Sequence, residues 1–357
     1  MTRHRVSFVA GFVLAVGFVA AVPATRAQSP SSLPASLSDQ EFWDLSAQLS
    51  EPNGYFRSDN LLSNEMGFQW VIPDLLSRTL PGGVYLGVGP EQNFTYITAL
   101  KPKMVFITDI RRGNLWTQLM YKALFEMSAD RSEFVARLFT KPKQAGFTAQ
   151  SSATDIFNKY WDVKTDDKAA FDKNSQDIIN WLTKAPHHIA LSAEDQKGII
   201  DDVYYYFWWY GPSINYNSSS GNGNRGGNMA TYYELMTATD LAGLSRAYVA
   251  NDESFKFMKD LESHNLLVPV VGDLGGPKAV RAVGKYIRDH GALVMAMYLS
   301  NVEQYLNQDG KWDAFCGNVA SMPLDEHSTF IRSANGGGRS GLQSELGSMK
   351  SDTQGCK

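Results

Sequence analysis

The chain contains 357 residues, of which 43% are hydrophobic and 20% are charged. This hydrophobic fraction is ample for a folded core, so disorder is expected to be a minor component. With 33 basic and 37 acidic residues the formal net charge is −4, and a chain of negative charge is a poor candidate for binding nucleic acid as its main partner.

The first residues predict an export signal. Arg3 and Arg5 form a basic start, residues 6–22 are mainly apolar, and small residues precede a cleavage site after Ala27. Residues 1–27 are therefore expected to be a signal peptide, which makes the mature protein periplasmic or secreted, with no stable membrane span. An uncleaved anchor is the alternative, since a spanning helix needs about 18 or more apolar residues. Cleavage removes three arginines and no acidic residue, so the formal net charge falls from −4 to −7.

Residues 28–80 are expected to form a leader followed by two helices. Ser38 to Glu41 have the pattern of a capping box at the start of an amphipathic helix, and a second helix is expected to end near Arg78. Between these helices, residues 57–65 bring many polar side chains together, Glu65 among them. These side chains either cap a binding crevice, because buried polar groups need partners, or simply cap a helix.

From residue 81 the pattern changes to short apolar runs that alternate with helices, which is typical of βαβ units and a parallel sheet. The predicted strands are residues 84–89, 104–109, 267–273, 292–299 and 328–332. Helices are expected at residues 276–290 and 312–322. Residues 81–130 and 265–335 are thus assigned to a doubly wound, mainly parallel, Rossmann-like α/β core.

Residues 131–264 interrupt this core and are expected to form a large helical insertion, because a structureless loop of that length is improbable inside a domain. Within the insertion, residues 201–210 form an aromatic block whose rings either line a hydrophobic pocket or pack between helices. Residues 218–228 are rich in Gly, Ser and Asn and are expected to be mobile.

Residues 336–357 are expected to form a flexible tail, since Gly and Ser are frequent in them. Cys356 in this tail and Cys316 are the two cysteines of the chain. An oxidising compartment permits a disulfide between them, but the sequence carries no geometry, so their pairing stays open.

Two glycines and a distant aspartate predict a nucleoside site. Gly87 and Gly89 follow the first strand, where glycines let a backbone approach a ligand closely. Asp109 ends the second strand 20 residues after Gly89, the usual spacing of a carboxylate that binds ribose hydroxyls. A turn glycine pair in an ordinary α/β protein is the alternative interpretation. Gln92 replaces the third glycine that a dinucleotide needs, and residues 272–278 lack the ending of a phosphate loop, so a nucleoside without pyrophosphate fits better.

The order of these motifs resembles the class I S-adenosylmethionine-dependent methyltransferases. In that family the first strand ends in a Gly-rich turn beneath the methionine part of the cofactor, and the second ends in an acid for the ribose. The third precedes an acidic residue near the adenine, and the fourth ends at the active site. The corresponding positions here are Gly87 and Gly89, Asp109, Asp273 with Leu274, and Ser300 to Glu303. The resemblance implies S-adenosylmethionine as cofactor and a sheet of strand order 3-2-1-4-5.

Residues 298–306 are similar to the strand-end motif of many small-molecule methyltransferases. Together with residues 56–65 and 231–240, they are also similar to a largely uncharacterised bacterial family with the same core, so the resemblance covers nearly all of the mature chain. Two positions depart from the methyltransferase pattern. Tyr85 replaces the usual acidic residue of the first strand, and Glu91 replaces the usual third glycine.

In a doubly wound sheet of this order, the connections leaving the first and fourth strands diverge and open a crevice at their carboxyl ends. The residues expected to bind the cofactor there are Gly87, Gly89, Glu91, Asp109, Asp273, Leu274 and Ser300. Asn301, Glu303 and Tyr305 are expected to take part in catalysis, the last two as candidate general bases. Arg111 and Arg112 pair with Asp109, bind an anionic ligand or stay solvated. No metal site is expected, since HExxH and CxxC spacings are absent from the sequence.

Three functions are compatible with these patterns. The first is an exported methyltransferase-like enzyme that binds S-adenosylmethionine or a related nucleoside, with the helical insertion supplying the acceptor site. The second is a non-catalytic protein that binds another small ligand on the same fold. The third is an interaction protein that uses the aromatic surface of the insertion. Whether the chain is catalytic, and which acceptor it would use, is not encoded in any motif.

Overall fold

Apolar strands buried on both faces form the centre of the fold, as expected for a parallel sheet covered by helices. The six strands lie in the order β3-β2-β1-β4-β5-β6. The five parallel strands are β1 (Val84–Gly87), β2 (Met104–Asp109), β3 (Leu267–Val271), β4 (Val294–Ser300) and β5 (Thr329–Asn335). β1 lies between β2 and β4. The predicted α/β sheet is therefore confirmed, with β1 and β4 as neighbours.

This structure is a computed structural model and describes residues 32–57, 60–163, 167–220, 229–335 and 342–356. The predicted signal peptide, residues 1–27, lies outside these ranges. By their backbone contacts, the described residues belong to one unit. Within the described ranges, no helix combines the length and the apolar composition that crossing a membrane requires.

The prediction of a flexible tail at residues 336–357 is wrong for most of the tail residues that the structure describes. β6 (Leu342–Ser348) pairs antiparallel with β5 along its whole length, and α15 (Met349–Asp352) follows it. The Gly- and Ser-rich sequence has little intrinsic strand preference, so the strand depends on hydrogen bonds to β5. A disulfide between Cys316 and Cys356, with a Cα–Cα distance of 5.6 Å, joins the end of the tail to α14. Because β6 joins the sheet beside β5, the sheet has one strand more than the predicted order 3-2-1-4-5.

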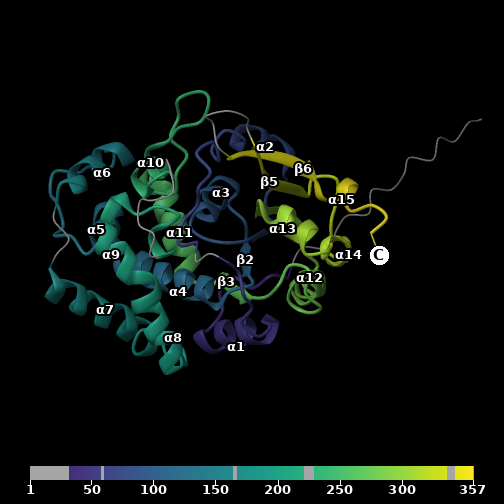
Figure 1. Cartoon of the computed structure of the whole chain (residues 1–357), viewed down its shortest axis with the longest axis horizontal. Helices are drawn as coiled ribbons and strands as arrows, with labels where there is room; N and C mark the ends of the chain where they lie inside the picture. The colour runs from purple at the N-terminus through teal and green to yellow at the C-terminus, as the bar shows by residue number, and fades with distance from the viewer. Residues whose placement is uncertain (1–31, 58–59, 164–166, 221–228, 336–341, 357) are drawn as a thin grey trace, which may run out of the picture. The chain divides into compact units, whose positions relative to one another are not determined.

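Helices cover both faces of the sheet (Figure 1). One layer contains α3 (Gln92–Leu100), α4 (Arg112–Met127) and α11 (Asp252–Ser263), and the other contains α1 (Asp39–Leu49), α12 (Ala279–Asp289) and α14 (Trp312–Ala320). α2 (Ile72–Arg78) precedes β1, and α13 (Val302–Gln308) follows β4. At α1 the predicted capping box is present, because the Ser38 hydroxyl accepts from the Glu41 N–H and the Glu41 carboxylate accepts from the Ser38 N–H.

The segment assigned to the insertion is helical. Its elements before α11 are α5 (Arg131–Leu138), α6 (Ala153–Trp161), α7 (Lys168–Thr183), α8 (Ala193–Lys197), the π-helix η1 (Gly198–Tyr204), α9 (Tyr205–Tyr210), the 3₁₀ turns η2 (Gly211–Ser213) and η3 (Ser218–Ser220), and α10 (Tyr232–Thr237). In the aromatic block, Tyr204, Phe207 and Trp208 are buried, whereas Trp209 is 57% exposed. Helix packing therefore accounts for most of this block.

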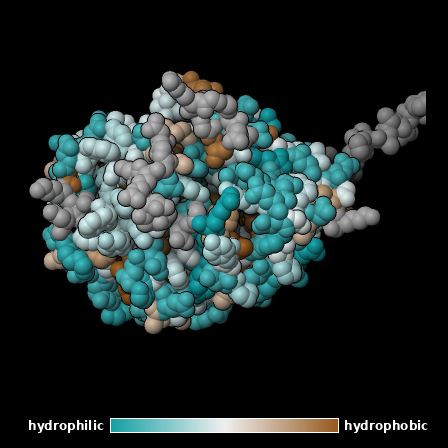
Figure 2. Space-filling model, in the orientation of Figure 1, coloured by the Kyte–Doolittle hydropathy of each residue, from teal (hydrophilic) through white to brown (hydrophobic). Residues whose placement is uncertain are grey.

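The face of the molecule in Figure 2 is mainly hydrophilic, and hydrophobic side chains appear on it in small separate patches. Large continuous apolar patches are the usual mark of a protein–protein interface.

A buried ionic network connects the N-terminal helix to the insertion. His187 lies between two carboxylates, with Nδ1 2.6 Å from Asp39 Oδ1 and Nε2 2.5 Å from Glu126 Oε2. Lys122 Nζ and Trp181 Nε1 also donate to the Glu126 carboxylate, at 2.7 and 2.6 Å. Burial lowers the pKa of His187, but its hydrogen bonds and its attraction to the two carboxylates outweigh burial and raise this pKa above its ordinary value.

This network predicts a pH dependence of stability. Because the pKa of His187 is raised in the folded state, its contribution is complete below the ordinary value of 6.5 and is lost as the pH rises through the folded-state pKa. We expect the His187→Gln variant to lack this loss, so that its free energy of unfolding depends less on pH above about 6.5. Urea unfolding across this range measures the difference. The control is His188→Gln, at the exposed histidine next in the chain. If the pH dependence of stability weakened equally in His188→Gln, the loss could not be assigned to His187.

Candidate functional site

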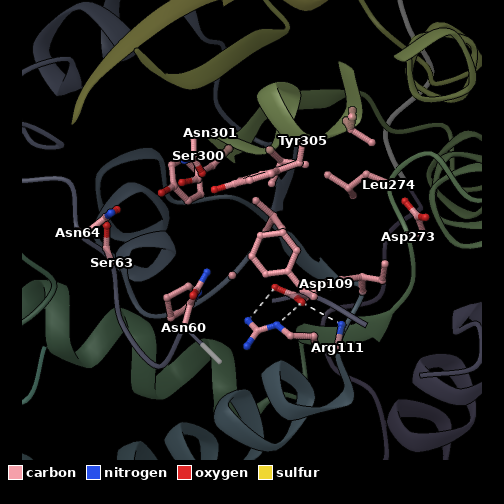
Figure 3. Close-up of a pocket in the computed structure, with 18 of the residues that line it drawn as sticks. Asn60, Ser63, Asn64, Asp109, Arg111, Asp273, Leu274, Ser300, Asn301 and Tyr305 are labelled. Carbon is pink, nitrogen blue, oxygen red and sulfur yellow. Dashed lines mark hydrogen bonds and ion pairs between the residues drawn. The ribbon is translucent and has the colours of Figure 1, made fainter. Parts of the chain in front are cut away.

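A cavity opens at the carboxyl ends of the parallel strands. Of the predicted site residues, those lining it are Gly89, Asp109, Asp273, Leu274, Ser300, Asn301 and Tyr305. Figure 3 shows Asp109 and Arg111 on one side of the cavity and Ser300, Asn301 and Tyr305 opposite them, while Leu274 and Asn64 lie at its two ends. Four strand ends thus meet at one hollow, because the carboxyl ends of parallel strands share one edge of the sheet.

The glycine turn after β1 is held by an asparagine. Asn93 Nδ2 donates to the Val88 and Pro90 carbonyls at 2.9 and 2.8 Å, and Tyr85 Oη donates to Asn93 Oδ1 at 2.9 Å. A Cβ atom at Gly87 would lie 1.9 Å from Asn93 Oδ1, so this glycine makes room for the asparagine. Gly87 is not among the residues that line the cavity, and its contact with a cofactor stays a prediction.

Gly89 has an unusual backbone conformation and lines the cavity. Its φ of +76° favours glycine, and a Cβ atom there would meet no atom within 4 Å. The backbone is therefore open toward the cavity at this point. The Val88 N–H donates to the Tyr298 carbonyl at 3.1 Å, which joins the turn to β4.

Glu91 was expected to bind the cofactor, and the structure places it elsewhere. Its side chain is fully buried at the start of α3, where Oε1 accepts a 3.4 Å hydrogen bond from the Ser63 N–H. Burial raises the pKa of Glu91 to about 8, so the group is mainly protonated at neutral pH. The helical backbone at this residue turns the side chain into the core rather than toward the cavity.

Asp109 lies at the cavity in contact with Arg111. Its Oδ1 accepts from the Arg111 N–H at 2.9 Å and from Nε at 3.3 Å, and Nη2 is 3.5 Å from Oδ2 (Figure 3). A carboxylate offers about four acceptor positions, so Oδ2 retains capacity for a ligand hydroxyl. Of the alternatives for the arginine pair, Arg111 binds Asp109 whereas Arg112 binds Asp195 at 2.6 Å.

At the β3 end of the cavity, Asp273 forms an ion pair with Lys311, with Oδ2 and Nζ 2.5 Å apart. The loop that follows resembles a phosphate loop only superficially. Glu51 Oε1 accepts from the N–H groups of Lys278 and Ala279, both at 2.8 Å. The start of α12 therefore binds a carboxylate of the same chain, in the place where a phosphate would bind.

Glu65 lies beside the cavity, although the sequence analysis did not include it among the predicted site residues. Its carboxylate is fully buried and accepts hydrogen bonds from Tyr298 Oη (2.8 Å), Ser300 Oγ (2.6 Å), Gln92 Nε2 (3.0 Å) and Ser344 Oγ (3.3 Å). Tyr298 and Ser300 line the cavity, so the carboxylate lies directly behind its wall. The polar run at residues 57–65 was the available signal, and its Asn60, Ser63 and Asn64 line the cavity, as the crevice-capping alternative requires.

α13 presents one face to the cavity and turns Glu303 away from it. Val302, Tyr305 and Leu306 line the cavity, at the spacing of one helical face. Glu303 lies off that face and pairs with Arg332 Nε at 2.9 Å. Glu303 is therefore not among the residues that line the cavity, whereas Asn301 and Tyr305 are.

Aromatic and basic side chains of the 53–62 loop cover Tyr305. Phe56 packs edge-on against the Tyr305 ring with centroids 5.0 Å apart, and Arg57 Cζ lies 4.4 Å from the Tyr305 ring centroid. The cavity volume in this arrangement is about 150 Å³. This is below the roughly 300 Å³ at which ligand pockets usually begin, so a ligand of nucleoside size requires Phe56 and its neighbours to move.

A second cavity of about 490 Å³ adjoins the first and shares Tyr55, Phe56, Asn60 and Arg111 with it. Its other side is formed by the start of α4 and by Asp202, Val203 and Tyr206 of the insertion. One ring of the aromatic block therefore does line a pocket. Among the residues described, no group of three or more His, Cys, Asp or Glu side chains is arranged to hold a metal ion.

Comparison with known proteins identifies a family. The model of a family described as "Domain of unknown function (DUF7790)" matches residues 61–354, which include all six strands and most of the cavity wall. No curated protein matches the sequence. Since the match covers most of the chain, this protein belongs to the DUF7790 family.

Proposed function

We propose that this protein binds S-adenosylmethionine or a related nucleoside in the cavity at the β1 and β4 strand ends, on a sheet of methyltransferase type. The observation that carries the proposal is the convergence of Gly89, Asp109, Asp273 and Ser300, from four strand ends, on one cavity. The neighbouring order β3-β2-β1-β4-β5 agrees with the order that the methyltransferase resemblance implies.

The chemistry of the cavity supports a nucleoside. Asp109 Oδ2 has capacity to accept a hydrogen bond from a ribose hydroxyl. Ile110 and Leu274 provide apolar wall beside Asp109 and Asp273, where a planar base would pack. Gly89 leaves the backbone open to close approach. The Glu51 carboxylate at α12 disfavours a pyrophosphate at that helix, in agreement with a ligand that lacks one.

For methyl transfer, the second cavity is the natural acceptor site, because it adjoins the first and reaches the insertion. Transfer needs the acceptor aligned with the methyl group and little else from the protein. Asn301 and Tyr305 are in place to position it.

A non-catalytic ligand-binding protein is the second candidate. It is favoured by the two acids that depart from their expected places, since Glu91 is buried in the core and Glu303 is paired with Arg332. Neither can serve as a general base in the cavity in this arrangement.

The proposal includes export of the protein to the periplasm or the medium. It is supported by the Cys316–Cys356 disulfide, because disulfides persist mainly in oxidising compartments. To test this, protein is isolated from the periplasmic fraction in the presence of an alkylating reagent, which modifies free thiols. We expect Cys316 and Cys356 to stay unmodified because they form a disulfide. Free thiols at both positions, in protein recovered only from the cytoplasm, would contradict it.

Calorimetry with S-adenosylmethionine and S-adenosylhomocysteine tests the binding. We expect saturable heat, and we expect Asp109→Asn to weaken the affinity at least about tenfold, because it loses a charged hydrogen bond worth roughly 1.5 kcal/mol. Asn keeps the shape and can still accept from the Arg111 N–H. The exposed Asp74→Asn is the matched control and should bind like the wild type. Cooperative unfolding shows that the protein sample is folded. If such a sample gave no binding heat at millimolar concentrations of either compound, the result would contradict the proposal.

A further inference from the structure

The last residue of β4 has an unusual backbone. Ser300 has a φ of +50°, and the pairing of β4 with β5 shifts register between Tyr298 and Ser300. The chain passes from this strand end through Asn301 directly into α13. A serine in a left-handed conformation at a sharp strand-to-helix turn exposes its hydroxyl at the edge of the sheet, and non-glycine residues in this region concentrate at functional sites.

The Ser300 hydroxyl is hydrogen-bonded to a carboxylate that is positioned by other groups. Ser300 Oγ donates a short hydrogen bond of 2.6 Å to Glu65 Oε1. Tyr298 Oη donates to the same oxygen, while Gln92 Nε2 and Ser344 Oγ hold Oε2. A nucleophile within hydrogen-bond distance of a base, with the base oriented by further groups, is the arrangement that activates serine in nucleophilic catalysis.

The cavity supplies the remaining requirements. Ser300 lines it, so a substrate in the cavity lies against this residue. Asn64 and Asn301 also line the cavity, and carboxamide N–H groups stabilise the negative oxygen of a tetrahedral intermediate. A volume of about 150 Å³ with Val302, Leu306 and aromatic rings in the wall suits a short, uncharged acyl group.

From these contacts we propose that Ser300 is a nucleophile, with Glu65 as its base, in acyl transfer from small uncharged esters. Ser300 Oγ bonds to the carbonyl carbon while its proton passes to Glu65. The carbon–oxygen bond to the alcohol breaks, and the proton passes from Glu65 to the leaving oxygen. Water then attacks the acyl group, releasing a carboxylic acid and restoring the serine. The surrounding sequence, Tyr-Leu-Ser-Asn-Val at residues 298–302, lacks the GxSxG pattern, so a motif search does not reveal it.

This activity does not depend on nucleoside binding, and its test is separate. The full purified chain is incubated with p-nitrophenyl acetate and nitrophenolate release is followed. The reaction is stopped with acid during turnover, before water removes the acyl group, and the acetylated peptide is identified by mass spectrometry. We expect one acetyl group on Ser300. We expect Glu65→Gln, which keeps the side-chain volume, to slow release by about 100-fold, the usual scale of a lost general base.

Two variants keep the test independent of folding. Ser300→Gly removes the hydroxyl, and glycine adopts a φ of +50° without strain, so this variant should stay folded and lose both the release and the label. Ser77→Ala, at an exposed serine of α2, is the matched control and should behave as wild type. Acetylation confined to lysines, or release that persists unchanged in Ser300→Gly or Glu65→Gln, would overturn the proposal.

Discussion

Replacing Cys356 with serine is expected to lower the free energy of unfolding by about 4 kcal/mol. The disulfide to Cys316 closes a loop with a sequence separation of 40, and constraining a loop of that length in the unfolded chain has roughly this effect. It also joins α14 to the end of the tail, where β6 and α15 have few buried side chains of their own. Denaturant unfolding of the variant and the wild type under non-reducing conditions measures the loss.

The same comparison under reducing conditions is the control. Reduction should destabilise the wild type to about the level of the variant and leave Cys356→Ser unchanged. Lys350→Ala, at an exposed position of α15, should change the free energy by less than about 0.5 kcal/mol. If the wild type and Cys356→Ser had the same midpoint of denaturant unfolding in the absence of reductant, the disulfide would contribute nothing to stability.

Glu65→Ala is expected to cost about 3 kcal/mol of stability. The carboxylate accepts four hydrogen bonds in a fully buried position, and its removal leaves buried donors without an acceptor, each at a cost of about 1 kcal/mol or more. Glu65→Gln should cost less, because it retains the volume and one carbonyl acceptor. Thermal and urea unfolding measure both.

The effect of Glu65 is set by burial, so an exposed glutamate should not share it. Glu326, whose side chain is 74% exposed, provides the control, and Glu326→Ala should lie within about 0.5 kcal/mol of the wild type. A loss in Glu65→Ala no larger than in Glu326→Ala would show that the four donors find other partners.

The positions at the strand ends could be predicted because local sequence decides them. A strand that is buried on both faces is a short apolar run, and the residue after such a run stands at the edge of the sheet. Gly89 and Asp109 were found in this way. Leu274, Asn301 and Tyr305 followed from the methyltransferase resemblance, and the structure places all of them at one cavity.

The sequence did not show which way the side chains of Glu91 and Glu303 turn. Glu91 is the N-cap residue of α3 and Glu303 lies in α13. Along a helix the direction of the side chains rotates by about 100° from one residue to the next, so a shift of one residue decides which way a side chain points. The packing of α3 turns the first into the core, and Arg332 on β5 attracts the second away from the cavity. In the same way β6 could not be predicted, because its strand conformation depends on pairing with β5 rather than on its own residues.

The sequence by itself determined the α/β architecture, the residues at the strand ends and the negative charge of the chain, since periodicity and composition are local properties. Only the tertiary structure decided which side chains meet. Glu65 and Ser300 are 235 residues apart in sequence, and Cys316 and Cys356 are 40 apart. Such pairs form because folding brings distant segments to one place, and no local pattern records that a buried carboxylate will find its hydrogen-bond donors there.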